Sequence, residues 1–356
     1  MNPKGTALLL IVLLVYVGAA LSICPVRGQI QQVKVAVAIA PLEGLVRSVG
    51  GVLVNTTILL PEGVEPHAAT LPPEAVMAAD SADLLVLTGH FPWEENLVSV
   101  VDTPFITLDD ADALFTYEDH GARLSPMPGH QENATTTADE HHHDEGNPHG
   151  YWLLPSNALA IANTTLSALE VISPAHNSTW EVGFSYFQNE VEAYLSLVAE
   201  ADTQYDLSGR KAVAVFPAEA YVAETFGIVT VAVLQVENVL ISGVELLEVQ
   251  ESMRNGSVSL IIGSDVASLQ TGGEYAVQLA EDYGATLVWV RAVFFEGLSD
   301  YISVMTYNLG AIVSGIAQAR GNLSSTVNVA LVALAGVLGL VAVLEAVVMV
   351  RRAKSE

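Results

Sequence analysis

The chain has 356 residues, a formal net charge of −27 at pH 7 and one cysteine. The negative charge argues against nucleic acid as a partner and favours attraction of cations, although an acidic surface also simply keeps an exported protein soluble. With Cys24 alone, an intramolecular disulfide and a cysteine-based metal site are both excluded, so any bound metal would use histidines and carboxylates.

Residues 1–28 have the layout of a secretory signal peptide or an N-terminal anchor. Lys4 precedes an apolar run over residues 7–23, and Cys24 follows that run. The residues before Cys24 resemble a lipoprotein cleavage box, but Ile23 is bulky where a small residue is usual, which argues against lipidation. We therefore expect the chain to be exported.

Residues 327–350 predict a transmembrane helix near the other end of the chain. They are apolar except for Asn328 and Glu345, and they are long enough to cross a hydrocarbon core of ~30 Å. The tail 351–356 carries Arg and Lys, and the positive-inside rule places it in the cytoplasm. We expect a single-pass protein of the cell membrane whose residues 29–326 face the exterior. Six Asn-x-Ser/Thr sequons in that stretch agree with a glycoprotein, at Asn55, Asn133, Asn163, Asn177, Asn255 and Asn322.

Short apolar runs alternate with stretches of helical spacing in the first half of the exterior part. The runs predict strands near residues 33–39, 84–87 and 105–108, and the helical spacing predicts helices at 42–49 and 73–82. An alternation of this kind is typical of a parallel sheet covered by helices.

The second half repeats this alternation. It predicts strands at 211–216, 230–233, 259–262 and 286–290, and helices at 219–226, 244–255, 274–283 and 299–317. Two further helices, at 156–169 and 174–205, join the halves, and the second is long enough to span both. The predicted fold class is α/β, with two parallel-sheet lobes joined by a long backbone helix. The predicted domains are a first lobe over 29–128 that ends with 149–173, a loop over 129–148, the backbone helix over 174–208 and a second lobe over 209–320.

The predicted loop is rich in histidine and acid. It contains His130, Asp139, Glu140, His141, His142, His143, Asp144 and Glu145. This tract has almost no apolar surface to bury, and its imidazoles suit zinc and neighbouring transition metals. We expect His141, His142 and His143 to capture metal at low affinity, while a loop without a metal role is the alternative.

Four segments resemble, in chain order, the metal-binding substrate-binding proteins of zinc and manganese ABC importers. They are residues 60–67 (LPEGVEPH), 79–89 (ADSADLLVLTG), 147–155 (NPHGYWLLP) and 300–309 (DYISVMTYNL). The resemblance implies that a divalent metal, zinc or else manganese, is held between two lobes by four side chains. It also implies delivery of the metal to an ABC permease and its ATPase.

The resemblance assigns His67 and His149 as metal ligands from the first lobe. An exposed loop histidine is the alternative for His67. His90 follows a predicted strand, and we interpret it as a capping or surface residue, with a place behind the metal site as the alternative.

The second lobe departs from the pattern of this family. Phe216 and Arg291 occupy the positions of the two expected ligands, and a guanidinium cannot coordinate a cation. Three explanations stay open: Glu219 or Asp265 substitutes, the loop histidines complete the site, or the site binds metal weakly or not at all.

The chain shows no Gly-rich phosphate loop, HExxH motif or nucleophile elbow, which favours binding over catalysis. The resulting hypothesis is an extracellular receptor, not an enzyme, that captures zinc for a permease. The alternative is a surface glycoprotein of the same fold that has lost its metal site and uses Arg291 to bind an anion or a partner.

Overall fold

The computed structural model describes residues 32–61, 63–128, 146–237, 239–293, 297–298 and 300–319. Those from Val33 onward belong to one compact unit. The predicted signal segment, most of the His-rich loop and the predicted transmembrane helix lie outside the described residues. The domain boundaries given above stay predictions.

The first lobe, as we call the part built on the N-terminal sheet, has five parallel strands in the order β2-β1-β3-β4-β5. The strands are β1 (Val33–Val37), β2 (Val54–Ile58), β3 (Leu84–Val86), β4 (Phe105–Thr107) and β5 (Phe115–Thr116). The central strand β3 is buried on both faces, as its continuous apolar run predicts. The edge strand β2 contains Asn55, Thr56 and Thr57 and is half exposed, which explains why hydrophobic patterning missed it.

Helices cover this sheet on both faces. They are α2 (Ala40–Gly50), α3 (Pro73–Asp80), α4 (Pro92–Val98) and α5 (Pro155–Ile172). The helices predicted at 42–49, 73–82 and 156–169 are therefore confirmed, whereas α4 was not predicted. Each of these four helices has proline in its first turn, where a missing N–H costs nothing and the fixed φ favours helix entry.

The second lobe, built on the C-terminal sheet, has four parallel strands in the order β11-β10-β6-β7. The strands are β6 (Lys211–Ala214), β7 (Val229–Val233), β10 (Leu260–Ser264) and β11 (Thr286–Val290). Its helices are α7 (Ala218–Thr225), α8 (Gly243–Arg254) and α9 (Thr271–Tyr283). All four predicted strands and these three helices are confirmed. An antiparallel hairpin of β8 (Gln235–Val236) and β9 (Val239–Leu240) was not predicted.

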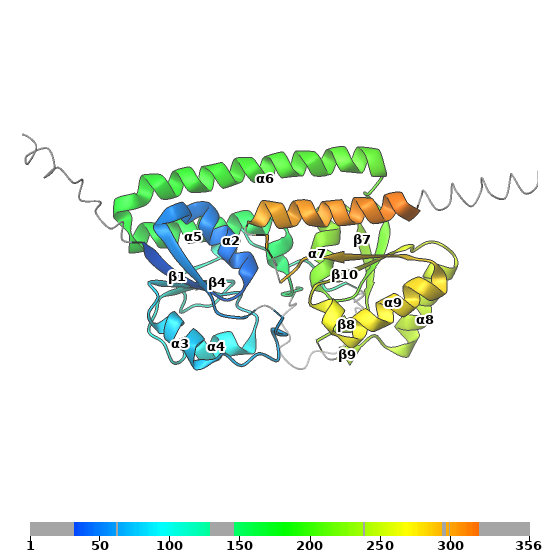
Figure 1. Cartoon of the computed structure of the whole chain (residues 1–356), viewed down its shortest axis with the longest axis horizontal. Helices are drawn as coiled ribbons and strands as arrows, with labels where there is room; N and C mark the ends of the chain where they lie inside the picture. The colour runs from blue at the N-terminus through cyan, green and yellow to red at the C-terminus, as the bar shows by residue number, and fades with distance from the viewer. Residues whose placement is uncertain are drawn as a thin grey trace, which may run out of the picture. The chain divides into compact units, whose positions relative to one another are not determined.

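The long helix α6 (Asn177–Tyr205) extends along both lobes (Figure 1). Its 29 residues correspond to about 43 Å. A Cβ at Gly183 would lie 2.2 Å from the Val49 carbonyl oxygen, so this glycine lets α6 contact α2 closely. In the second half of α6, the Tyr194 hydroxyl donates to the Met305 carbonyl and so connects α6 to the C-terminal helix Tyr301–Ala319. The predicted backbone helix is confirmed.

The helix Tyr301–Ala319 is long and apolar enough to cross a membrane by length and composition, and α5 with α6 passes the same test as a bent pair. Among the described residues, however, the buried face of the C-terminal helix packs into the core through Tyr301, Val304, Met305, Leu309, Ile312 and Ile316. A spacing of three to four residues between buried positions is typical of a helix in the core of a globular protein.

Candidate metal site

The carboxyl ends of parallel strands collect the candidate residues at one cavity between the lobes. This edge is where open α/β sheets usually bind ligands. The cavity is lined from the first lobe by Glu65, Pro66, His67, His90, Phe91, His149, Gly150 and Trp152. From the second lobe it is lined by Phe216, Pro217, Ala218, Glu237, Ser264, Val266, Ala292 and Val293.

His67 lies in a short turn that its neighbours hold in place. The Glu65 carboxylate accepts hydrogen bonds from the backbone N–H groups of His67 (3.1 Å) and Ala68 (2.6 Å). The indole N–H of Trp93 donates to the Pro66 carbonyl at 3.2 Å. Both contacts fix the backbone on either side of the histidine, so the ring is presented to the cavity by a rigid turn.

His90 follows β3 through Gly89, which adopts a left-handed φ of 74°. A Cβ there would lie 2.6 Å from the Thr107 hydroxyl, so only glycine fits this turn. The buried Glu94 carboxylate then accepts from the backbone N–H groups of Thr88 (2.8 Å), His90 (3.1 Å) and Phe91 (3.3 Å). Burial raises the pKa of Glu94, and these hydrogen bonds oppose that rise.

His149 is oriented by Asn147, a buried residue that also contacts the second lobe. The Asn147 side-chain oxygen accepts from the His149 backbone N–H (3.0 Å) and lies 3.2 Å from the ring Nδ1. Its amide nitrogen donates to the Pro217 carbonyl at 2.8 Å, which fixes the orientation of the amide. Because an oxygen acceptor faces Nδ1, the proton belongs on Nδ1 and the lone pair on Nε2. A hydrogen bond of this kind prepares a histidine for metal binding.

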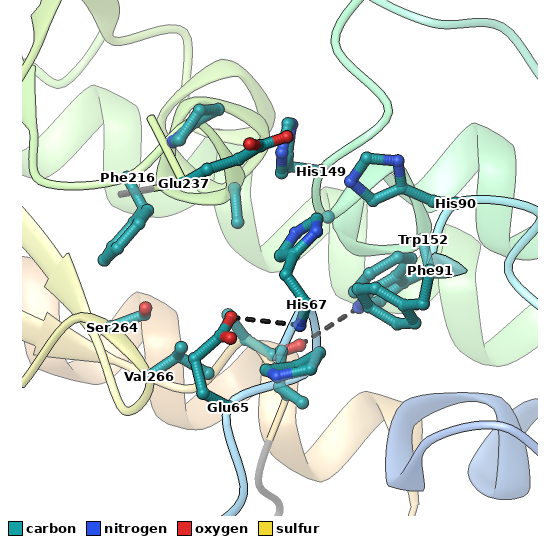
Figure 2. Close-up of a pocket in the computed structure, with 16 residues that line it drawn as sticks. Glu65, His67, His90, Phe91, His149, Trp152, Phe216, Glu237, Ser264 and Val266 are labelled. Carbon is teal, nitrogen blue, oxygen red and sulfur yellow. Dashed lines mark hydrogen bonds between the residues drawn. The ribbon is translucent and has the colours of Figure 1, made fainter. Parts of the chain in front are cut away.

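The three imidazoles meet in one cluster (Figure 2). Ring centroids are 4.3 Å apart for His90 and His149, 4.8 Å for His67 and His90, and 5.2 Å for His67 and His149. One nitrogen from each ring lies within 4.8 Å of the others. Tetrahedral zinc with bonds of ~2.0–2.1 Å would place its nitrogen ligands about 3.4 Å apart, so small side-chain movements would complete the geometry.

Two observations show that the cluster fits a cation. The Nε2 atoms of His90 and His149 are buried and have no hydrogen-bond partner. A buried polar atom left unpaired costs about 1–3 kcal/mol, so such atoms call for a functional explanation. The cavity measures about 50 Å³. One water needs at least ~10–15 Å³ by a similar measure, so the space suits an ion with a few waters rather than an organic molecule.

Burial also lowers the pKa values of the three imidazole rings. The pKa of His90 is lowered to about 2 by burial and, to a smaller extent, by the charges of His149 and His67. Burial lowers the pKa of His149 to about 4, again helped by His67. The pKa of His67 is lowered by burial, while Glu65 and Glu237 oppose that effect. All three imidazoles are therefore neutral at pH 7, which is the form that coordinates metals.

The structure does not bring the suggested second-lobe substitutes to this cavity. The Glu219 carboxylate is buried in the first turn of α7, where it accepts from the Phe216 N–H at 2.5 Å, and burial raises its pKa to about 8. The Asp265 carboxylate accepts from the backbone N–H groups of Ala292 and Val293. Both side chains stabilise loops at the ends of strands.

Phe216 lines the cavity, as its position in the pattern predicts, but it offers no donor atom. The Arg291 guanidinium lies over the Tyr307 ring at 5.6 Å from its centroid and is not among the cavity residues. The loop histidines His141, His142 and His143 lie outside the described residues.

Among the imidazoles and carboxylates that line the cavity, sequence patterns did not single out His90 or Glu237 as candidate ligands. The interpretation of His90 as a capping or surface residue differs from the structure, in which Gly89 and Glu94 turn its ring toward His67 and His149. The available signal was its position directly after a buried strand. For Glu237 the sequence offered no such signal, because Glu237-Asn238 lacks the glycine typical of a two-residue hairpin turn.

The family model of the periplasmic zinc-uptake complex component A, ZnuA, matches residues 35–315. The chain belongs to the ZnuA family. A high-affinity zinc uptake system protein ZnuA of Yersinia pestis is 26% identical over 166 residues, which cover 44% of this chain and 52% of that protein. The match thus spans about half the length of that curated relative.

Solved structures confirm the α/β fold of this ZnuA-family chain. The zinc-bound crystal structure of a ZnuA deletion mutant superposes with a TM-score of 0.62 at 21% identity, covering 79% of this chain and 97% of the other. The Mn-bound periplasmic metal-binding protein of Candidatus Liberibacter asiaticus gives a TM-score of 0.62 at 17% identity, covering 80% and 100%. The metal-binding family suggested by the sequence is therefore confirmed.

Proposed function

We propose that this chain is an extracytoplasmic receptor that captures Zn²⁺ between its two lobes and delivers it to an ABC permease driven by an ATPase. The observation that carries the proposal is the half-buried cluster of His67, His90 and His149, in which two buried Nε2 atoms at the small cavity have no hydrogen-bond partner. Membership of the ZnuA family supports the same role.

Zinc is favoured over manganese by the chemistry of the donors. Imidazole nitrogen suits Zn²⁺, whereas Mn²⁺ prefers carboxylate and water oxygens. Three neutral histidines therefore favour zinc, even though several similar structures carry manganese.

Capture starts with a hydrated ion attracted by the negative charge of the chain. The His-rich tract over 129–145 raises the local metal concentration, and the ion then exchanges waters for the three imidazoles. Docking onto the permease loosens these contacts and releases the ion. The proposed anchor over 327–350 keeps the receptor at the membrane surface, where the permease lies.

Zinc titration of the full-length chain in mild detergent tests this proposal. We expect one tight site in the wild type that is weakened at least about 100-fold by His90→Ala or by His149→Ala. That loss exceeds the 10- to 100-fold typical of a residue that only supports a ligand. The matched control is His176→Ala, because His176 contacts Ser173 and lies outside the cluster. Equal zinc affinity in all three variants and the wild type would overturn the proposal.

A further inference from the structure

Three imidazoles leave one position of a tetrahedral zinc site open, and all three come from the first lobe. The second lobe forms the opposite wall of the cavity, mostly with apolar side chains. Within the described residues, the side-chain oxygens on that wall belong to Ser264 and Glu237. The Ser264 hydroxyl already accepts from the Ala267 N–H at 3.2 Å. Glu237 is therefore the one carboxylate on the second-lobe wall of the described cavity.

Among the described residues, two carboxylates line the cavity, those of Glu65 and Glu237, and their contacts differ. Both oxygens of Glu65 accept backbone hydrogen bonds that hold the His67 turn. In the part of the chain that the structure describes, the Glu237 carboxylate has no hydrogen bond or ion pair, and its residue is exposed. Figure 2 shows its side chain extending from the hairpin toward the imidazole rings. Glu237 and His67 line the same cavity, and the charge of Glu237 raises the pKa of His67.

The hairpin holds Glu237 in a set position. The residue adopts a left-handed φ of 49°, which is uncommon outside glycine and recurs at functional sites. The buried Gln235 side chain donates to the Glu237 carbonyl at 2.6 Å and accepts from the Gly272 N–H at 2.7 Å. Gln235 thus connects the hairpin to the start of α9 by hydrogen bonds, and these contacts hold the backbone of Glu237 in place.

We propose that Glu237 supplies the fourth ligand to the captured ion, so that hairpin β8–β9 closes the site from the second lobe. This inference rests on the proposed function, because it needs zinc at the three histidines. A carboxylate in this place neutralises part of the charge of the ion in a cavity with apolar walls. The Glu237 carboxylate would replace the second-lobe ligands that Phe216 and Arg291 do not provide. The bound ion would then link the two lobes directly.

The test compares Glu237→Gln and Glu237→Ala with Glu248→Gln in the full-length chain. Glu248 is an exposed residue of α8 outside this cavity, so its variant makes the same change in net charge. Zinc affinity is measured by competition with a chromophoric chelator, counting only the site that His149→Ala removes. We expect both Glu237 variants to bind zinc at least about tenfold more weakly, no less than is typical for loss of a residue that only supports a ligand, and Glu248→Gln to match the wild type.

The second readout is the visible absorption of the Co²⁺-loaded protein, which reports the ligands around the metal and does not depend on affinity. Exchange of the carboxylate for water should change the position and intensity of these bands in both Glu237 variants. Thermal unfolding in chelator verifies that the metal-free variants are folded. If the wild type binds zinc through His149 and the Glu237 variants match Glu248→Gln in affinity and spectrum, this inference is wrong and the proposed function stands. If the wild type has no His149-dependent zinc site, both this inference and the proposed function are wrong.

Discussion

Among single residues, His90 and His149 stand out because each has one buried ring nitrogen without a hydrogen-bond partner. Protein interiors rarely leave such atoms unpaired. Each is also held neutral by burial and by its neighbours. The metal-free protein therefore carries a cost in stability that a bound cation would remove, because the cation would pair with the same lone pairs.

The depressed histidine pKa values predict how the metal-free protein responds to acid. The pKa of His149 is about 4 in the folded chain, below the ordinary value of 6.5, so the unfolded chain binds more protons between these values. The unfolding free energy should therefore be highest above about pH 6.5 and fall toward pH 4, by up to about 1.4 kcal/mol per pH unit for each buried histidine. Denaturant unfolding in chelator between pH 4.5 and 7.5 measures this slope.

The control for this slope is His176→Ala, which should keep it, whereas His149→Ala should reduce it. An identical pH dependence in the wild type and in His149→Ala would show that His149 is not held neutral in the folded state.

At the scale of elements, Glu94 at the start of α4 connects stability to the site. Its carboxylate accepts from three backbone N–H groups, including that of His90. Glu94→Ala removes the carboxylate that accepts from these donors and should lower the unfolding free energy by about 2–4 kcal/mol. Zinc affinity should also fall by about 10- to 100-fold, because the His90 turn loses its support.

Glu95→Ala is the matched control, since Glu95 is the next residue of the same helix and is exposed. It should change the unfolding free energy by no more than about 0.5 kcal/mol. Chemical denaturation and zinc titration of the two variants test both effects. Wild-type stability in Glu94→Ala would show that the backbone hydrogen bonds to this carboxylate do not stabilise the fold.

Sequence patterns predicted the elements with strong apolar periodicity and missed the weakly patterned ones. β3 and β10 are buried on both faces, so their apolar runs were clear. The strands β2 and β5 were missed because one is half polar and the other has two residues. The site residues differed in the same way. His67 and His149 lie in segments with a family pattern and were predicted as ligands. The positions of His90 and Glu237 are set by the turn at Gly89 and by the β8–β9 hairpin, which the sequence did not predict.

At the scale of the whole molecule, the lobes are joined by more than α6. The segment after the His-rich tract donates to or accepts from the second lobe at several points. The Trp152 indole donates to the Ala292 carbonyl at 3.0 Å, and the Asn147 amide donates to the Pro217 carbonyl at 2.8 Å. The Tyr301 hydroxyl donates to the Leu153 carbonyl at 3.2 Å. Such buried contacts limit the movement of one lobe relative to the other. Metal capture would therefore require movement of side chains and of the hairpin only.

We propose that the cavity between the lobes, and not the His-rich tract, holds the metal. This is tested by calorimetric zinc titration of the chain lacking residues 129–144, with His149→Ala in the same background as the control. Tight one-to-one binding should survive the deletion and disappear with His149→Ala. Loss of all tight binding on deletion of the tract would contradict the claim and would place the metal on the tract itself.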